Sequence, residues 1–379
     1  MREAVLTSGP ATAFLTDWRR GLDWPILFAA CLLLGVGLLM SLAAGPPAAA
    51  RLGYEDSFFF VKRQAVFSLL ALGVLVSTSL LERVWSRRLA ALVFAGAFVL
   101  LVYILMAGHE AKGAQRWIRL AGLSLQPSEF AKPALLVLAA WLLAQRHLFQ
   151  EGPWTSLTLG LFCATVGLFL LQPDVGQSVL LTFAFSATFF VAGVGWRLAL
   201  SFLAAGAGLV GVLYATLPHV RFRLNSFINP AAYDTYQVDT AREAIARGGL
   251  VGVGPGEGRI KTALPDAHTD FIYAVLGEEF GYLAALALIC VFAFITWRGL
   301  KQAARLRDPY PRAAATGLFA LFGLQAAINI GVNVGLIPPK GMTLPLVSYG
   351  GSSLIGTALT LGLALALIRR ARPAWKERL

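Results

Sequence analysis

Charge is scarce in this chain of 379 residues. Charged residues make up 14% of the sequence and hydrophobic residues 57%. Because a soluble domain of ordinary composition carries about 25% charged residues, the composition excludes an ordinary soluble enzyme and indicates a membrane protein. The net charge of +12 comes from basic residues that flank apolar segments. Charge in that position does not build the basic face of a nucleic-acid-binding domain, so no nucleic-acid partner is expected.

Cysteine, histidine and nucleotide-binding motifs are also few or lacking. Each cysteine lies inside an apolar run, as small hydrophobic residues do, so no disulfide framework is expected. The four histidines show no metal-ligand spacing. The glycine-rich segment 248–258 follows no strand and lacks a GxxxxGK[ST] motif. We interpret it as a loop at membrane level, where backbone passes close to lipid or substrate. The cysteines are Cys31, Cys163 and Cys290.

Apolar runs of about 20 residues, the length needed to cross a bilayer, recur along the chain. We predict ten transmembrane helices and an all-α polytopic membrane fold. Within 155–194 the only interruption is Gln172-Pro173-Asp174, which is also compatible with a kink in one bent helix. Residues 1–23 lack the apolar core and cleavage site of a signal peptide. The predicted spans are 24–44, 64–81, 89–107, 130–145, 155–172, 176–194, 197–216, 271–297, 312–336 and 351–369.

Lysine and arginine in the short loops predict the orientation of the chain. They favour cytoplasmic tails at 1–23 and 371–379, around one transmembrane domain at 24–370. Residues 218–270 then form a large extracytoplasmic loop between the seventh and eighth helices. This loop holds several basic residues, as long loops tolerate. A second basic set, which includes Arg116 and Lys132, lies at a short outer loop, where it suits an anionic substrate.

The stretch LPDAHTDFIYAVLGEEFG, residues 264–281, combines titratable groups with the start of an apolar run. Such groups at the end of a membrane helix cost several kcal/mol to desolvate, so a functional role is expected. The alternative is a solvated loop that caps a helix, although a cap needs only one acid. We predict that Thr269 caps the helix and that Asp270 lies in its first turn. The titratable residues are Asp266, His268, Asp270, Glu278 and Glu279.

Two other segments carry polar residues among apolar ones. Glu129 and Lys132 follow Pro127 at the start of a predicted helix and are spaced to pair on one face, either for function or simply to anchor the helix end. Residues 335–353 are rich in proline, glycine and hydroxyl groups. Such irregular backbone is tolerated at membrane depth only when it is buried in protein or lines a wet cavity. Lys340 in this segment is a candidate phosphate contact.

Six motifs of unusual composition follow one another along the chain: GAQRWI (113–118), QPSEFAK (126–132), QPDVGQ (172–177), NP…YQ…AI (229–245), LPDAHTDFIYAVLGEEFG (264–281) and KGMTLPLVSYGGSS (340–353). Together they resemble the signature blocks of the SEDS (shape, elongation, division and sporulation) family. The blocks run in family order and are long and unusual in composition. The segment AIARGGLVGVGPGEGRIK and the AVLGEE block are more similar to the cell-division branch, the FtsW type, than to the elongation branch, the RodA type.

The resemblance implies the SEDS fold and a peptidoglycan glycosyltransferase that polymerises lipid II at the outer face of the cytoplasmic membrane. An α-linked donor that gives a β-linked product requires one direct displacement, with one general base and stabilisation of the leaving pyrophosphate. Asp270 matches the essential aspartate of the family and is the expected base. A divalent cation, Mg or Mn, would suit the leaving group, although the sequence shows no dedicated cage. The expected substrate-binding residues are Arg116, Glu129, Lys132, Asp174, His268, Lys340 and Ser348.

Other functions remain open at this point. A lipid II flippase also explains intramembrane charge, but a transport path should place polar groups at mid-depth, where these helices are almost purely apolar. An elongation polymerase and a division scaffold are further alternatives. The resemblance also implies a single-pass class B penicillin-binding protein as a transpeptidase partner, with other divisome proteins. We predict that this partner packs against small-residue faces on helices 312–336 and 351–369, at Gly317, Gly323, Gly331, Gly356 and Gly362.

Overall fold

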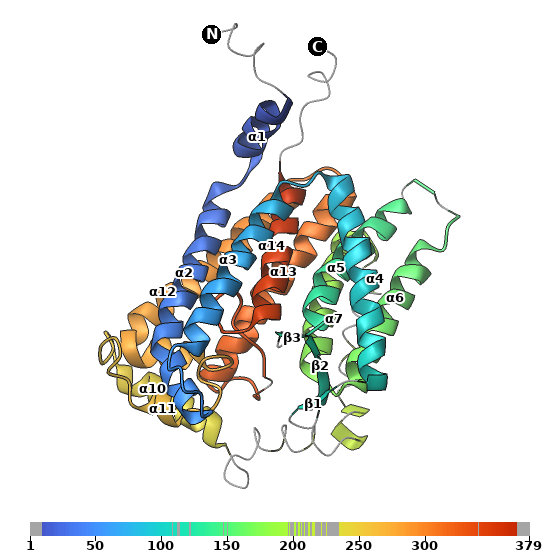
Figure 1. Cartoon of the computed structure of the whole chain (residues 1–379). Coiled ribbons are helices and arrows are strands. Elements are labelled where there is room, and N and C mark those ends of the chain that lie inside the picture. Colours follow the sequence, from blue (N-terminus) through green and yellow to red (C-terminus); the bar gives the residue numbers. More distant parts are fainter. Residues whose placement is uncertain are drawn as a thin grey trace, which may run out of the picture.

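The computed structural model shows a bundle of long helices with a small sheet at one end (Figure 1). The start of α2 and the last turns of α12 and α14 meet at the opposite end, which we call the terminal end. We call the end with the strands the sheet end. The structure describes residues 10–107, 109–111, 114–120, 123–146, 148–149, 151–195, single positions between 197 and 225, 235–339 and 341–369.

Most of the chain folds into helices. They are α1 (Pro10–Gly21), α2 (Trp24–Arg51), α3 (Phe59–Ser79), α4 (Arg83–Ala107), α5 (Ser128–Gln145), α6 (Trp154–Leu171), α7 (Val175–Val191), α10 (Tyr236–Gly248), α11 (Ile260–Ala263), α12 (Ile272–Ala304), α13 (Pro309–Asn333) and α14 (Gly351–Ile368). The strands β1 (His109–Ala111), β2 (Ala114–Leu120) and β3 (Leu123–Leu125) form an antiparallel sheet in the order β1-β2-β3.

Each predicted span except 197–216 coincides with a helix, and 197–216 lies largely outside the described residues. Within the described part of the chain, seven helices are long and apolar enough to cross a membrane. Residues 155–194 form two helices, α6 and α7, because the turn at 172–174 ends the first and begins the second. Neither α1 nor the strands are expected from the sequence. Strands as short as these beside a membrane helix show too few residues for the alternating apolar pattern that predicts a strand.

The glycines of α13 and α14 lie inside the bundle, so the predicted docking faces for a partner are wrong. A Cβ on Gly317 would lie 1.9 Å from Thr188 of α7, and one on Gly362 would lie 1.8 Å from Thr78 of α3. A Cβ on Gly356 would likewise lie against the backbone of Glu129. One on Gly323 would lie against Thr296 and one on Gly331 against Ile337. Small residues do allow close helix approach, as expected, but the partners are helices of the same chain. Of the most apolar window of α14, 89% is buried.

A break in α12 receives the glycine-rich loop that follows α10. Gly281 has φ +77°, which interrupts the helix and leaves backbone groups without intrahelical partners. The amide groups of Tyr282 and Leu283 donate to the carbonyls of Gly249 and Leu250 (2.8 and 3.2 Å). A Cβ on Gly281 would lie 2.4 Å from the amide nitrogen of Gly252. The loop thus supplies hydrogen-bond acceptors for the amide groups at the break in α12, as irregular backbone in a membrane protein requires.

Candidate active site

The segment between α13 and α14 is irregular, as predicted, and of the two expected settings, burial in protein or the wall of a wet cavity, the structure shows burial. Its side chains Met342, Leu344, Leu346 and Val347 are at most 4% exposed. Hydrogen bonds from Gln325 of α13 to the Thr343 carbonyl (3.3 Å) and from Gln64 of α3 to the Val347 carbonyl (3.4 Å) hold it in place. Residues 341–350, which we call the inner loop, therefore form a fixed wall inside the bundle. Lys340, the candidate phosphate contact, lies outside the described residues.

Asp270 lies in a tight turn that precedes α12. The amides of Thr269 and Asp270 both donate to the carbonyl of Asp266 (3.0 Å each). Asp266 has φ +55°, a left-handed conformation that aspartate tolerates better than most residues. The N-cap of α12 is Phe271, so the prediction that Thr269 caps the helix is wrong. The Thr269 hydroxyl donates to the Asp266 carbonyl (3.2 Å), because the turn closes before the helix begins.

The carbonyls of this turn are held from the inner loop and from α13. The amide of Tyr349 donates to the carbonyl of His268 (2.9 Å) and the hydroxyl of Ser348 donates to that of Thr269 (2.5 Å). The carboxamides of Asn329 and Asn333 both donate to the carbonyl of Asp270 (2.8 and 3.0 Å). The Asp270 side chain is only partly buried, whereas Ser348 is 2% exposed. The turn is thus fixed through its backbone.

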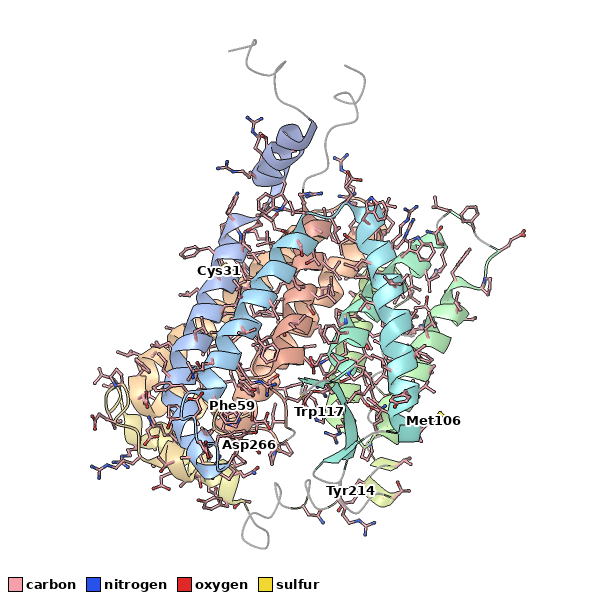
Figure 2. The ribbon with its side chains drawn as sticks, in the orientation of Figure 1. Cys31, Phe59, Met106, Trp117, Tyr214 and Asp266 are labelled. Carbon is pink, nitrogen blue, oxygen red and sulfur yellow. The ribbon has the colours of Figure 1, made fainter. Side chains whose placement is uncertain are left out.

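Aromatic rings and a glycine surround the turn. The ring of His268 is 7% exposed and lies 4.5 Å from the ring of Phe60 and 5.5 Å from that of Tyr349. Gly341 has φ +64°, and a Cβ there would lie 3.6 Å from Oδ2 of Asp270. The inner loop therefore passes beside the carboxylate itself. Figure 2 shows Phe59 and Asp266 near the sheet end.

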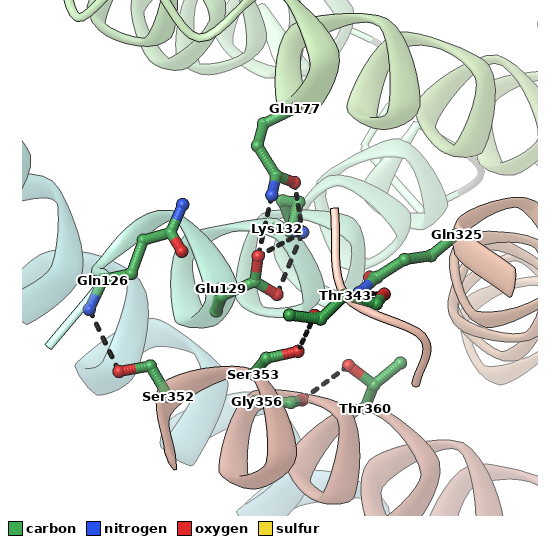
Figure 3. A network of polar contacts seen from close by, with 10 residues as sticks. All are labelled: Gln126, Glu129, Lys132, Gln177, Gln325, Thr343, Ser352, Ser353, Gly356 and Thr360. Atoms are coloured by element: carbon green, nitrogen blue, oxygen red, sulfur yellow. Dashed lines mark hydrogen bonds and ion pairs between the residues drawn. The ribbon is translucent and has the colours of Figure 1, made fainter. Parts of the chain in front are cut away.

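A second polar cluster joins α5 and α7 (Figure 3). The Lys132 ammonium donates to both carboxylate oxygens of Glu129 (3.1 Å each) and to Oε1 of Gln177 (2.5 Å). Gln177 in turn donates to Glu129 (2.8 Å). The predicted pairing of Glu129 with Lys132 is confirmed, and the two side chains are 4% and 1% exposed. Lys132 has three donors, and all of them have partners within the chain.

Arg116 on β2 binds the turn between α6 and α7. Its guanidinium donates to the carbonyls of Gln172 (3.2 Å) and Pro173 and lies 3.6 Å from a carboxylate oxygen of Asp174. Asp174 is 5% exposed. Burial raises the pKa of the Asp174 carboxyl, and the charges of Arg116 and Lys132 oppose that rise. Arg116 therefore links the small sheet to the cluster around Lys132.

The inner loop lies between the two polar groups. Its Thr343 hydroxyl bonds with that of Ser353 in the first turn of α14 (2.5 Å, Figure 3). One turn later, a Cβ on Gly356 would lie 2.8 Å from the carbonyl of Glu129. The loop that clamps the Asp270 turn is thus continuous with the helix that packs on the Glu129–Lys132 pair.

Glu278 and Glu279, predicted to belong with Asp270, have structural partners instead. Glu278 is fully buried and accepts hydrogen bonds from the backbone amides of Arg259, Ile260 and Lys261 (2.8, 2.8 and 3.0 Å). Glu279 forms a buried ion pair with the Lys261 ammonium. These acids hold the start of α11, which follows the glycine-rich loop.

Sequence reasoning missed Asn329, Asn333 and Gln177. Two asparagines four residues apart in an apolar helix are a signal for a buried role, and both are at most 1% exposed. Gln177 lies in the motif QPDVGQ but was not singled out. Within the described residues, no group of three or more His, Cys, Asp or Glu side chains could hold a metal ion.

The chain is similar to known proteins over almost its whole length. A family model described as "Cell cycle protein" (FtsW, RodA and SpoVE) matches residues 24–372. The probable peptidoglycan glycosyltransferase FtsW of Caulobacter vibrioides is 46% identical over 94% of this chain and 92% of its own length. The FtsW of Geobacter sp. strain M18 is 36% identical over 93% of this chain and 98% of its own length.

Solved structures share the fold. A chain of a peptidoglycan synthase complex, studied for its coordination of polymerization and crosslinking, is 29% identical with a TM-score of 0.74 over 92% of this chain and 97% of that chain. The rod shape determining protein RodA of Thermus thermophilus is 29% identical with a TM-score of 0.68 over 92% of this chain and 96% of that one. The chain therefore belongs to the FtsW/RodA/SpoVE family, the SEDS family of multi-pass membrane proteins.

Proposed function

We propose that this protein is a peptidoglycan glycosyltransferase of the cell-division type, which polymerises lipid II into glycan strands for the septal wall. The names of the curated relatives support the activity and the division role. The observation that carries the mechanism is the Asp270 turn, in which a partly exposed carboxylate stands on a backbone fixed from two sides.

The proposed chemistry is a single displacement at C1 of the donor sugar. Asp270 accepts the proton of the acceptor 4-hydroxyl as that oxygen bonds to C1, and the lipid pyrophosphate leaves with the electrons of the broken bond. One general base of this kind contributes about 10²–10⁴-fold. His268 packs against the rings of Phe60 and Tyr349 and would orient the turn rather than bind the sugar directly, since it is 7% exposed.

The cluster of Glu129, Lys132 and Gln177, with Asp174 in the turn before α7, supports the leaving-group side of the proposal. In this structure Lys132 bonds to Glu129 and Gln177, and Arg116 bonds to the turn at 172–174. Either cation would have to exchange these partners to bind a pyrophosphate. Lys340 remains a proposed phosphate contact on sequence grounds. A divalent cation would supply further charge neutralisation to the pyrophosphate, but the described acids form no cage for it.

The proposed orientation places the terminal end in the cytoplasm and the Asp270 turn at the outer face. Basic side chains hold the terminal end together: Arg298 pairs with Asp23 (2.7 Å), Arg83 with Asp308 (3.3 Å), and Arg369 donates to the carbonyls that end α3. This matches the positive-inside rule. The peptidoglycan synthase complex supports a class B penicillin-binding protein as partner, with other divisome proteins as further contacts.

Polymerisation of purified lipid II tests the function. The full chain in detergent, alone and with its class B partner, is expected to yield glycan polymer, with more product in the complex. Transport of labelled lipid II across vesicles, without polymer in either preparation, would favour a flippase and refute the proposal.

A further inference from the structure

Asn329 and Asn333 of α13 hold one backbone atom of the proposed active site. Both carboxamides donate to the carbonyl of Asp270, and that of Asn329 also donates to the carbonyl of Met342 in the inner loop (2.6 Å). The oxygen of Asn333 accepts the amide of Ala274 (3.1 Å), in the first turn of α12. Two residues one helical turn apart thus tie together the Asp270 turn, the inner loop and the start of α12.

The inner loop holds the Asp270 turn from a second side. The Ser348 hydroxyl donates to the carbonyl of Thr269 and accepts from the amide of Leu344 (2.8 Å), so it has a partner both as a donor and as an acceptor. With the Tyr349 amide on the carbonyl of His268, three consecutive carbonyls of the turn have partners outside it. The backbone at Asp270 cannot rotate without breaking buried hydrogen bonds, each costly to leave unmade. These bonds therefore fix the point at which the Asp270 side chain leaves the main chain.

We propose that Asn329, Asn333 and Ser348 are positioning residues, which form a carbonyl clamp that aims the Asp270 carboxylate at the acceptor hydroxyl. This inference rests on the proposed function, in which Asp270 is the base. It also gives Ser348 a role other than the substrate contact predicted from sequence. A general base must lie within hydrogen-bond reach of the proton that it accepts, and a misplacement of about 1 Å can cost about 100-fold in rate. Because Asn329 and Asn333 lie on helix α13, the clamp fixes the position of the Asp270 backbone relative to that helix.

The first experiment measures polymerisation kinetics and thermal unfolding of clamp variants in the full chain. Asn329→Leu, Asn333→Leu and Ser348→Ala are expected to lower kcat by about 10- to 100-fold, while KM for lipid II stays near the wild-type value. Ser348→Thr keeps the hydroxyl and is expected to restore most of the rate. Asn333→Asp keeps the oxygen that accepts from the Ala274 amide but removes the donor to the Asp270 carbonyl. It tests the same prediction if Asn333→Leu does not fold, and its kcat is expected to fall.

A matched control separates positioning from stability. Gln302→Leu removes a carboxamide of α12 that donates to Asp23 (2.9 Å) at the terminal end. It is expected to lower the melting temperature with kcat unchanged. Clamp variants that lose melting temperature and retain wild-type kcat would overturn the proposal.

A second readout does not depend on activity. In a chain with Cys31, Cys163 and Cys290 replaced by alanine, Asp270→Cys introduces one thiol whose rate of alkylation by a maleimide reports its orientation. Adding Asn329→Leu or Ser348→Ala is expected to change that rate several-fold, whereas Gln302→Leu leaves it unchanged. If the rate changes while the wild-type chain makes no polymer, the proposed function fails and the clamp stands. If the wild-type chain polymerises but the rate and kcat do not change, the clamp fails.

Discussion

Asp270 lies in the turn before α12, and Glu278 and Glu279 lie on the second turn of that helix. The Asp270 side chain is partly exposed, and its turn is anchored by backbone carbonyls. The two glutamates are at most 1% exposed, and their carboxylates accept bonds from residues 259–261 at the start of α11. One acidic stretch therefore holds a carboxylate available for chemistry and two that maintain the fold.

Asp270 differs from the two glutamates in whether the bonds that hold the segment in place go to its main chain or to the carboxylate. A buried carboxylate must have hydrogen-bond or ion-pair partners, because desolvation is otherwise too costly. Glu278 and Glu279 have their partners at the start of α11, so they can neither move nor accept a substrate proton without loosening that helix. Asp270 keeps part of its surface accessible because the turn is held through the main chain. Proximity in sequence to the proposed base is thus no evidence of a shared role.

The largest expected effect comes from Asp270→Ala. Loss of the base should lower polymerisation of lipid II by about 10²–10⁴-fold, while the free energy of unfolding changes little because the backbone bonds of the turn remain. Polymer yield and thermal melting in detergent measure the two quantities. Asp56→Asn, which removes an exposed acid paired with Lys62, should leave both unchanged. Wild-type activity in Asp270→Ala would break the comparison.

Lys261→Met is expected to show the opposite pattern. It leaves the carboxylate of Glu279 buried without its ion-pair partner, which costs about 3–5 kcal/mol of stability, while kcat per folded molecule is retained. Lys62→Met is the matched control, since its exposed pair with Asp56 contributes at most about 1 kcal/mol. Chemical unfolding and active-site-normalised rates check the result. A loss of kcat without loss of stability would assign Glu279 to the chemistry.

Glu278→Gln is expected to have the smallest effect. The amide oxygen can still accept from Arg259 and Ile260, but the bond from the Lys261 amide loses its acceptor. The expected cost is about 1–3 kcal/mol, with faster proteolysis of the 249–258 loop and unchanged kcat. Protease resistance that equals that of the wild type would show that the glutamate does not hold the loop.

Much of the architecture could be predicted from the sequence because its causes are local. Apolar runs of bilayer length define the helices, and all predicted spans within the described residues appear. The spacing of Glu129 and Lys132 places them on one helical face, where they pair. The proline- and glycine-rich composition of the inner loop predicted irregular backbone, either buried in protein or lining a wet cavity, and the structure shows that it is buried.

Other features depend on contacts between distant segments, which no local pattern specifies. Gly317 and Gly362 are small in any reading of the sequence, but only the packing shows that Thr188 and Thr78 of the same chain occupy the space beside them. Thr269 has the composition of a helix cap, yet the fold closes a turn on Asp266 before the helix begins.

The sequence by itself determined the membrane class, the spans, the family and the candidate Asp270. The tertiary structure alone decided which acids are structural and which side chains hold the Asp270 turn. The reason is that helix formation and membrane insertion depend on neighbouring residues. Satisfaction of buried polar groups instead depends on partners such as Asn329 and Asn333, which lie 59 and 63 residues along the chain from Asp270.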